Sequence, residues 1–360
     1  MDRSHRTNPC IGRPLRIGEV ELSTNLLLAP VAGYCDLAWR VVCREQGGVG
    51  LACTDLLSPQ GLLRGTAHSL DLAMTNDFDR PLGMQLYGGD GGILAEGALW
   101  AVRHGATVID INMGCPVDKV TKKDGGSKLM CDLARTVSIA ERVTGEVGRA
   151  TKGRVPVTAK MRLGWSCGDL AAPELAVRLA RVGIAAVTVH GRYAAQHFKG
   201  EACLDGIKAV VEAMRAEPVP VPVIGNGDVV NGAAAVKMMS RTGCDGVMIG
   251  RGSFSRPWVF REAWAAQRGD LIAEPSEAEK IAVIRRYFGL MLEYRDERYA
   301  LTNIRRRISW LGKALGPCKP MKERVRLAAT AAEVWAALDE FESGGLRMFE
   351  SDREEAEAIA

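Results

Sequence analysis

The feature that most constrains the fold of this chain is a regular alternation of short apolar segments with longer segments of helical periodicity. The short segments are rich in Val, Ile and Leu and end in Gly, Pro or a polar residue, which is typical of strands buried on both faces. There are eight of them, at residues 25–30, 51–57, 81–88, 107–116, 155–164, 185–192, 221–229 and 245–252. Intervening segments such as 175–183 and 205–217 place apolar residues every three or four positions, as amphipathic helices do.

Eight strand–helix units in about 250 residues predict a TIM (β/α)8 barrel. A doubly wound parallel sheet is the competing architecture, and the count of eight favours the barrel. The chain has 360 residues, and single cores rarely grow beyond ~250–300, so we expect a second, smaller domain. Helical spacing without strand patterns follows Pro257, which predicts a small all-α C-terminal domain. The expected organisation is an N-terminal extension over 1–17, the barrel over 18–270 and a helical domain with an acidic tail over 271–360.

Composition excludes several classes of protein. With 47% hydrophobic and 25% charged residues, the chain has the balance of a globular protein rather than a disordered one. No apolar run approaches the ~18–20 residues that span a bilayer, and the polar start MDRSHRTNPC does not resemble a signal peptide, so we expect a cytoplasmic protein without a membrane partner. The ten cysteines form no C-x-x-C pair, so we expect no metal site and no disulfide framework, with most cysteines buried as small hydrophobes.

The net charge of +4 hides an uneven distribution. Residues 280–330 hold thirteen Lys or Arg against four Asp or Glu, whereas 331–360 hold two Arg against nine Asp or Glu. A predicted helix within the basic segment buries an apolar stripe from Leu301 to Leu315 and leaves Arg298, Arg305 and Arg306 outside it. Such a helix is either an ordinary solvated surface or a surface for a phosphate backbone.

Polar residues follow six successive predicted strands at their C-terminal ends, which is where TIM barrels carry their reactive groups. Polar side chains at the end of a buried strand are costly without partners, so packing alone is a poor explanation for all six. The residues are Gln85, Asn112, Cys115, Lys160, Arg162, His190, Arg192, Asn226, Asp228, Gly250 and Arg251.

Two adjacent glycine-rich turns, IGNGDV and IGRGS, follow the last two predicted strands and point to a phosphorylated ligand. The alternative is that Gly227 and Gly250 merely permit tight turns. Lys160 is suited to stabilising negative charge on a bound ring, and His190 could donate a hydrogen bond to the same ligand. Cys115 lies between Gly114 and Pro116; its residue type leaves nucleophile, proton donor and bystander all open.

Taken together, these segments resemble the tRNA-dihydrouridine synthases, flavoproteins that reduce a uridine in tRNA to 5,6-dihydrouridine. The similarity runs in order through LLLAPVAGYCD, MQLYG, DINMGCPVDKV, GGSKLM, AKMRLGW, TVHGRYAAQ, VIGNGDV and VMIGRGS, over residues 26–253. It extends to NIRRRISW at 303–310, which is similar to the basic helix of the bacterial B-type branch. Ordered matches over about 230 residues are far more specific than one glycine-rich turn.

The resemblance implies a TIM barrel that holds FMN at its mouth and a helical domain that binds tRNA. The implied flavin contacts are Pro30, Val31, Ala32, Gln85, Lys160, His190, Asn226, Gly227, Asp228, Gly250 and Arg251. Cys115 matches the catalytic cysteine, and the implied substrate contacts are Asn112, Arg162, Arg192, Arg298, Arg305, Arg306 and Arg307. Two departures are visible: Val31 replaces the usual Met, with little expected effect, and Cys35 replaces the usual Thr, which alters the fine shape of the base pocket.

The implied reaction has NADPH, the preferred reductant, reduce FMN. Hydride then passes from flavin N5 to C6 of the uracil, and Cys115 donates the proton to C5. The uridine must leave the base stack to reach the barrel mouth. No obligate protein partner is expected.

Two alternatives remain at this level. An FMN oxidoreductase acting on a free pyrimidine, similar to dihydroorotate dehydrogenases, shares the barrel and the flavin but has no use for a basic helical domain. A non-catalytic RNA-binding barrel accounts for the basic segment but leaves the flavin positions and Cys115 without a role.

Overall fold

The computed structural model describes residues 8–347, which form two units. The first unit runs to Ser253 and includes Trp258–Leu271. The second comprises Phe254–Pro257 and the chain from Ile272 onward.

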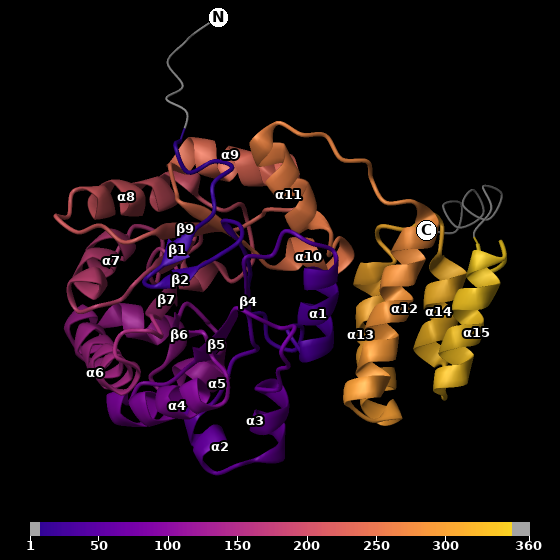
Figure 1. Ribbon diagram of the computed structural model, residues 1–360, viewed down its shortest axis with the longest axis horizontal. Helices are drawn as coiled ribbons and strands as arrows, with labels where there is room; N and C mark the ends of the chain where they lie inside the picture. Colours follow the sequence, from indigo (N-terminus) through magenta and orange to yellow (C-terminus); the bar gives the residue numbers. More distant parts are fainter. Residues whose placement is uncertain (1–7, 348–360) are drawn as a thin grey trace, which may run out of the picture. The chain divides into compact units, whose positions relative to one another are not determined.

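The first unit is a closed barrel of eight parallel strands in the order β10-β3-β4-β5-β6-β7-β8-β9. Figure 1 shows these strands surrounded by helices. Every predicted strand segment contributes one strand, so the prediction of a TIM barrel is confirmed. Their bounds are β3 Leu26–Leu28, β4 Leu51–Cys53, β5 Leu82–Leu86, β6 Val108–Met113, β7 Val157–Met161, β8 Val187–His190, β9 Val223–Asn226 and β10 Gly246–Ile249. Nearly every strand residue is buried, which explains the continuous apolar runs in the sequence.

Helices surround the barrel and connect its strands. Several begin at an Asp or Asn whose side chain accepts a hydrogen bond from the first turn, as Asp90 does from Ile93 N and Asp132 does from Arg135 N. The helices are α1 Leu37–Glu45, α2 Pro59–Leu63, α3 Ala67–Leu72, α4 Gly91–Arg103, α5 Asp118–Thr121, η1 Gly126–Cys131, α6 Leu133–Thr151, α7 Ala172–Arg181, η2 Ala194–Gln196, α8 Leu204–Arg215, α9 Gly232–Thr242, α10 Arg251–Ser255 and α11 Val259–Arg268.

A two-stranded hairpin, β1 Arg16–Ile17 and β2 Val20–Glu21, precedes the barrel and was not predicted. Leu15, Ile17 and Leu22 are buried in one cluster with residues at the start of several barrel strands, such as Val108. The hairpin therefore covers the N-terminal end of the barrel. A boundary between residues 17 and 18 would cut through the hairpin, so the barrel unit starts earlier than expected.

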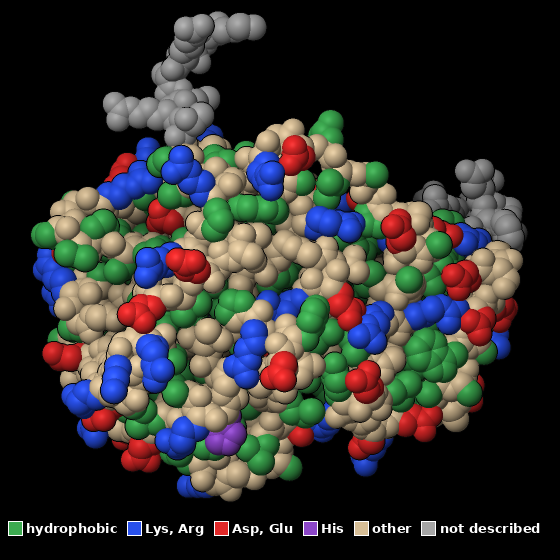
Figure 2. Space-filling view, viewed as in Figure 1, with side chains coloured by type: hydrophobic (Ala, Val, Ile, Leu, Met, Phe, Trp, Pro, Cys, Tyr) green, Lys and Arg blue, Asp and Glu red, His purple; other side chains and the backbone are tan. Residues whose placement is uncertain are grey.

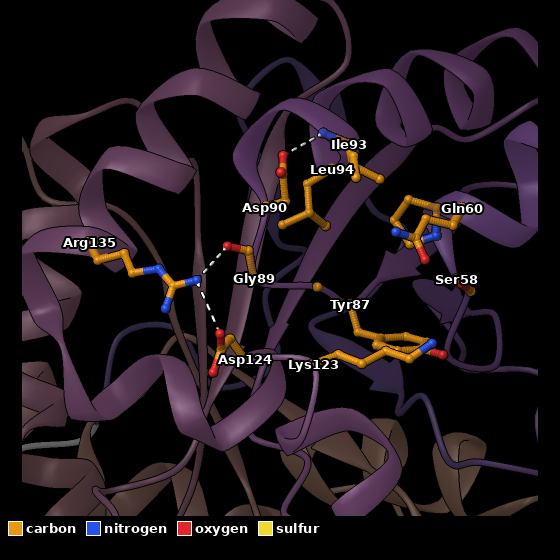
Figure 3. A pocket seen from close by; sticks show the side chains of 12 residues that line it. Ser58, Gln60, Tyr87, Gly89, Asp90, Ile93, Leu94, Lys123, Asp124 and Arg135 are labelled. Atoms are coloured by element: carbon orange, nitrogen blue, oxygen red, sulfur yellow. Dashed lines mark hydrogen bonds and ion pairs between the residues drawn. The ribbon is translucent and has the colours of Figure 1, made fainter.

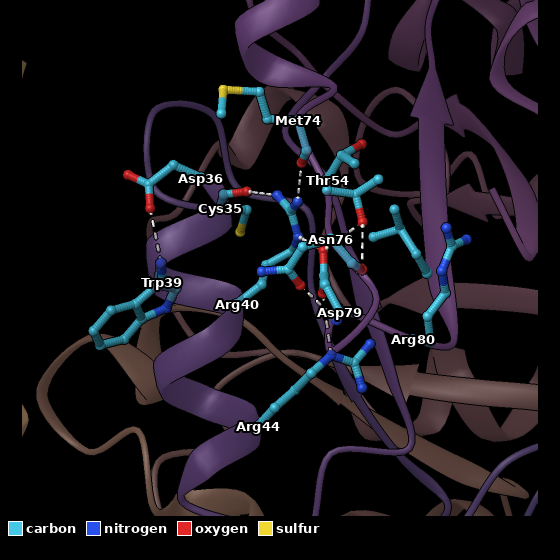
Figure 4. Close-up of polar contacts among 12 residues, drawn as sticks. Cys35, Asp36, Trp39, Arg40, Arg44, Thr54, Met74, Asn76, Asp79 and Arg80 are labelled. Atoms are coloured by element: carbon cyan, nitrogen blue, oxygen red, sulfur yellow. Dashed lines mark hydrogen bonds and ion pairs between the residues drawn. The ribbon is translucent and has the colours of Figure 1, made fainter. Parts of the chain in front are cut away.

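A buried ion pair supports the loop after β3 (Figure 4). The Arg40 Nε donates to Asp79 Oδ2 at 2.8 Å, and both side chains are fully buried. Arg40 also donates to the carbonyls of Cys35 and Met74, and Arg44 Nε donates to Asp79 Oδ1 at 3.1 Å. Asp79 thereby holds α1 and the loop that precedes it against the segment before β5.

The described part of the second unit is entirely helical, as predicted: α12 Glu277–Tyr294, α13 Glu297–Leu311, α14 Lys319–Leu327 and α15 Ala331–Glu342. The first helix begins with a capping box in which Ser276 and Glu279 satisfy each other's backbone N–H groups. The predicted stripe on α13 is buried, including Ile304 and Ile308 at 0% exposure. Leu315 is also buried but lies beyond the end of the helix.

Acidic residues of α15 pair with basic residues of the second unit. Arg285 forms ion pairs with Asp339 and Glu342, and Arg324 lies 3.4 Å from Glu340. Lys or Arg and Asp or Glu side chains alternate over the face of this unit that Figure 2 shows. The start of the acidic tail thus neutralises part of the basic segment, and residues 348–360 lie outside the described part of the chain.

The cysteines are less buried than expected. Cys35, Cys43, Cys53, Cys244 and Cys318 are buried, but Cys131, Cys167 and Cys203 are exposed and the other two are intermediate. All ten are free thiols. Within residues 8–347, no helix combines the length and the apolar character that crossing a bilayer requires.

Candidate active site

The polar residues that follow the barrel strands lie side by side at the barrel's C-terminal end. The strand register pairs Asn112 on β6 with Lys160 on β7, and His190 on β8 with Asn226 on β9. Gln85 on β5 pairs with Asp110 on β6. The closed barrel therefore gathers residues that are far apart in the chain, such as Gln85 and Asn226, which are 141 positions apart, around one mouth.

A chain of hydrogen bonds connects the barrel interior to the loop of Cys115. Gln85 Nε2 donates to Asp110 Oδ2 at 2.6 Å, and Asn112 Nδ2 donates to Gln85 Oε1 at 2.7 Å. Asn112 Oδ1 in turn accepts from the backbone N–H of Gly114 at 3.3 Å and of Cys115 at 3.0 Å. Asn112 thus lies directly beneath the loop that carries Cys115.

The Cys115 loop is fixed on its other side by η1. Ser127 N donates to the Cys115 carbonyl at 3.0 Å, and Gly126 has φ +60°, where a Cβ would come within 2.4 Å of that carbonyl. Only glycine fits this approach. Burial raises the pKa of the Cys115 thiol, while the Val117 backbone, Arg162 and Lys160 lower it less. Cys115 is therefore a protonated thiol at neutral pH.

Lys160 reaches across the mouth, where its Nζ donates to Asn226 Oδ1 at 2.9 Å. Burial and then the neighbouring Arg162 lower its pKa to about 8, although Asp110 opposes the shift. Asn226 Nδ2 donates to the carbonyl of Met248 at 2.7 Å, so both ends of its amide are held. The ammonium is held at the barrel mouth by Asn226, and its pKa is closer to neutrality than that of an ordinary lysine.

His190 is buried and surrounded by cations. Burial, followed by Lys160, Arg162, Arg192 and Arg251, lowers its pKa to about 2, so the ring is neutral at physiological pH. Its Nε2 lies 3.3 Å from Arg192 Nη1. Since a guanidinium can only donate, Nε2 accepts, and Nδ1 carries the proton. His190 is therefore a neutral hydrogen-bond donor through Nδ1.

Asp228 is the acidic counterpart of these cations. Its Oδ2 accepts from Arg192 Nη2 at 2.6 Å and from Ala202 N at 2.8 Å, and Arg251 Nη2 lies 3.3 Å from Oδ1. Burial raises its pKa, but these hydrogen bonds and charges outweigh burial and lower it. Gly227 has φ +128°, and a Cβ there would lie 2.7 Å from Ala202 and 3.2 Å from His190. The GNGD turn thus requires its glycine.

The loop after β3 carries Pro30, Val31 and Ala32. Its unusual Cys35 closes this loop, because the thiol donates to the Ala29 carbonyl at 3.0 Å and accepts from Val31 N at 3.3 Å. A hydroxyl could make the same two contacts. Gly250, after β10, lies beside this loop, where a Cβ would reach Val31 and Ala29 only at ordinary contact distances. Gly250 is therefore not required by sterics alone.

Arg162 is buried and its hydrogen bonds go to the protein backbone. Nε donates to the Gly114 carbonyl at 2.9 Å, and Nη1 donates to the carbonyls of Tyr193 at 2.9 Å and His197 at 2.8 Å. Arg192 is similarly buried, with the Lys199 and Gly200 carbonyls as additional acceptors. These two arginines hold the loops around Cys115 and His190 by hydrogen bonds, and they also add positive charge near His190.

Phe198 was not predicted from the sequence. Its side chain is 55% exposed, and its ring centroid lies 4.7 Å from the Arg251 guanidinium and 5.7 Å from that of Arg162. An exposed aromatic ring between two cations offers a stacking surface for a planar group. One sequence feature could have pointed to Phe198: it is an aromatic residue that follows HGRYAAQ, shortly after the polar C-terminal end of β8.

Asp110 was not predicted either, although a carboxylate inside the apolar run VIDINM was a visible signal.

Of the residues expected at the substrate in the second unit, Arg298, Arg305 and Arg306 on α13 are exposed. Arg307 is only 4% exposed, and its guanidinium lies 5.0 Å from the Tyr287 ring centroid. Arg307 packs inside the second unit, against the prediction that its side chain contacts substrate.

A pocket of about 260 Å³ lies at the same end of the barrel, between α2, α4 and the turn before η1 (Figure 3). Arg135 donates to the Gly89 carbonyl at 2.9 Å and lies 3.6 Å from Asp124, while Asp90 caps α4. Because these charges are matched, the pocket lacks the excess of cations found around His190.

Comparison with known proteins identifies a family. The family model described as "Dihydrouridine synthase (Dus)" matches residues 27–343. Among similar curated proteins is a probable tRNA-dihydrouridine synthase of Rickettsia prowazekii, 32% identical over 329 residues, covering 91% of this chain and 97% of the relative. One from Synechocystis is 34% identical and covers 89% of this chain and 87% of the relative. One from Mycobacterium tuberculosis is 34% identical and covers 90% and 84%. These names do not specify a branch of the family.

Solved structures support the fold. A histamine dehydrogenase from Rhizobium sp. 4-9 matches with a TM-score of 0.53 and 14% identity, covering 79% of this chain and 51% of that chain. Morphinone reductase matches with a TM-score of 0.51 and 12% identity, covering 75% and 92%. At such low identity the likeness concerns the barrel alone.

Proposed function

The chain belongs to the dihydrouridine synthase family, and from this membership we propose that it reduces a specific uridine of tRNA to 5,6-dihydrouridine. The observation that carries the proposal is the position and protonation of Cys115. Its loop is held from two sides at the mouth of a TIM barrel, and burial keeps its thiol protonated. A protonated thiol can donate the proton that C5 of the uracil requires when C6 receives hydride.

The site has the chemistry that FMN requires. Lys160, Arg162, Arg192 and Arg251 all lie near His190, and Asp228 compensates only part of their charge. This excess of cations suits a phosphate, which a TIM barrel commonly binds at the ends of its last two strands. When bound, FMN would supply the hydride that the uracil receives.

The chain's own residues would divide the remaining tasks. Lys160 would stabilise negative charge on the flavin ring, and Asn226 would meet its polar edge, with Pro30, Val31 and Ala32 lining the site. Gln85 is fully buried, so it would act through Asn112. Asp228, Gly250 and Arg251 would lie at the phosphate. Neutral His190 would donate a hydrogen bond, and Asn112 would contact the substrate base. Phe198 would offer the base a stacking surface.

The second unit is the proposed tRNA-binding part of the molecule. Its helix α13 exposes Arg298, Arg305 and Arg306, which fits contact with a phosphate backbone. We propose NADPH as the reductant and the cytoplasm as the place of action, where tRNA is modified. The resemblance of 303–310 to the B-type branch would place the target in the D-loop of tRNA.

The test is to incubate the purified, FMN-loaded protein with unmodified tRNA and either NADPH or NADH, and to map dihydrouridine by position. One uridine should be reduced, faster with NADPH. Reduction of free pyrimidines but not of tRNA would favour the free-pyrimidine oxidoreductase. Protein that binds tRNA but retains no flavin would favour a non-catalytic RNA-binding barrel.

A further inference from the structure

We propose that Asp110 is a positioning residue that fixes the Cys115 loop through Gln85 and Asn112. Its consequence for catalysis depends on the proposed function, whereas its consequence for the loop does not. Asp110 lies on β6 at 3% exposure, and Gln85 and Asn112 are 0% and 5% exposed. Bulk water therefore does not compete for their hydrogen bonds.

The two ends of this hydrogen-bond chain determine its direction. At one end, both oxygens of the Asp110 carboxyl group accept, Oδ1 from Thr158 Oγ1 and Oδ2 from Gln85 Nε2, both at 2.6 Å. Burial raises the pKa of this carboxyl group, whereas the hydrogen bonds from Gln85 and Thr158 and the charge of Lys160 lower it. At the other end, the backbone N–H groups of Gly114 and Cys115 can only donate.

The two amides between these ends have only one compatible orientation. Gln85 must turn its NH₂ toward Asp110, which leaves its oxygen for the NH₂ of Asn112. The oxygen of Asn112 then faces the loop. Reversing either amide would oppose donor to donor or acceptor to acceptor at two buried contacts.

Without a carboxylate at residue 110, the buried NH₂ group of Gln85 has no acceptor, and only the N–H groups of the loop still oppose a reversal of the two amides. A reversed pair of amides would turn the Asn112 NH₂ toward the N–H groups of Gly114 and Cys115. The loop would lose the acceptor that holds it from below, although Arg162 still binds the Gly114 carbonyl and Ser127 the Cys115 carbonyl. Cys115 would then be less well placed over the site.

The test compares Asp110→Leu, which removes the acceptor but keeps the branched shape of the side chain, with Thr158→Val as its matched control. Thr158→Val also removes a buried hydrogen bond to Asp110 but leaves the link to Gln85 intact. Two measurements need no substrate: hydrogen exchange of the peptide containing Gly114 and Cys115, and the alkylation rate of Cys115 by iodoacetamide. We expect both to rise about tenfold in Asp110→Leu and to stay near wild type in Thr158→Val, at comparable losses of Tm.

Two further variants keep the proposal testable if Asp110→Leu does not fold. Gln85→Met interrupts the same chain at its next link and should loosen the loop to the same degree. Asp110→Asn can still turn its oxygen toward Gln85 and its NH₂ toward Thr158, so it should partly restore protection. Wild-type exchange and alkylation in both Asp110→Leu and Gln85→Met, or in Gln85→Met alone if the first is unfolded, would overturn the proposal.

The catalytic consequence is measured separately in single turnovers. In Asp110→Leu loaded with FMN, oxidation of the reduced enzyme by tRNA should slow about tenfold, while reduction by NADPH changes much less. Wild-type protein that fails to reduce tRNA would count against the proposed function and leave the loop measurements standing. Loosened loops with unchanged turnover would remove the role of Asp110 in catalysis.

Discussion

The Lys160 ammonium and the Asn226 amide oxygen meet at 2.9 Å across the barrel mouth, joining β7 to β9. Lys160 is the cation whose charge the site holds least firmly, because burial and Arg162 lower its pKa to about 8. A bound anion would favour its protonated form. The affinity of the site for an anionic flavin should therefore depend on pH in the range where the free protein's Lys160 titrates.

The first prediction is that FMN binding to the apoprotein weakens as pH rises above about 8. Since the complex favours protonated Lys160, Kd should rise toward tenfold per pH unit above that pKa. Lys160→Met should bind FMN more weakly at pH 7 and show a flat profile. Quenching of FMN fluorescence in titrations at pH 7, 8 and 9 measures both. Equal slopes for wild type and variant would exclude Lys160 as the titrating group.

The second prediction concerns Cys115. Cys115→Ala should retain FMN and its reduction by NADPH, because Cys115 makes no hydrogen bond to Lys160, His190 or Asn226 within the described residues. Dihydrouridine formation should fall by about 10²–10⁴, the range that a general acid contributes. Cys131→Ala, an exposed cysteine at the end of η1, is the control. Dihydrouridine at wild-type rates in Cys115→Ala would remove Cys115 from the mechanism.

The barrel strands could be predicted because burial on both faces leaves uninterrupted apolar runs in the sequence. The β1–β2 hairpin could not, since each strand has two residues and its buried Leu15, Ile17 and Leu22 follow no regular period. The hairpin forms because its apolar side chains pack against the N-terminal end of the barrel, and that contact is not visible in the local sequence.

Site residues could be predicted where a polar residue ends an apolar strand, as Lys160 and His190 do. Asp110 has the same kind of signal, but its importance depends on contact with Gln85, 25 residues earlier in the chain. That contact exists only through the register of β5 with β6. Phe198 depends likewise on arginines from two other strand ends. Sequence patterns predict the strands and helices, whereas the contacts between side chains from different strands depend on closure of the barrel.

The third prediction tests the buried pair beneath the loop after β3. Asp79→Asn leaves the fully buried Arg40 guanidinium without its ionic partner, which should lower the free energy of unfolding by about 3–5 kcal/mol. Urea unfolding followed by circular dichroism measures this change. Asp77→Asn, an exposed carboxylate two residues away, should cost less than about 0.5 kcal/mol. A similar small loss in both variants would mean that Asp79 does not stabilise the barrel.

The fourth prediction concerns α13. Replacing Arg305 and Arg306 together by Ala should weaken tRNA binding and lower the slope of log K against log salt by about one for each phosphate that the helix no longer neutralises. Both side chains are exposed, but Arg305 also donates to the Ala328 carbonyl, so Tm should fall slightly. Lys152→Asn, at the C-terminal end of α6, is the control for loss of a positive charge elsewhere. An unchanged salt slope in the double variant would exclude α13 from the tRNA interface.

The last prediction follows from the neutral state of His190. Its pKa is about 2 in the folded protein against 6.5 for an unperturbed histidine, because of burial and then the surrounding cations. Between these values the unfolded chain binds more protons than the folded one, so stability falls as pH falls. From pH 7 to pH 5 this histidine alone should cost the apoprotein about 2 kcal/mol, measured by urea unfolding at both values. Between pH 7 and pH 5, the His190→Gln variant should lose about 2 kcal/mol less stability than the wild type. The control is His68→Gln, which removes an exposed histidine on α3 and should lose as much stability as the wild type. FMN should reduce the loss in the wild type, because a phosphate near Arg192 and Arg251 offsets part of the positive charge that keeps His190 neutral. Acid sensitivity that is the same in His190→Gln and wild type would mean that the folded protein does not lower the pKa of His190.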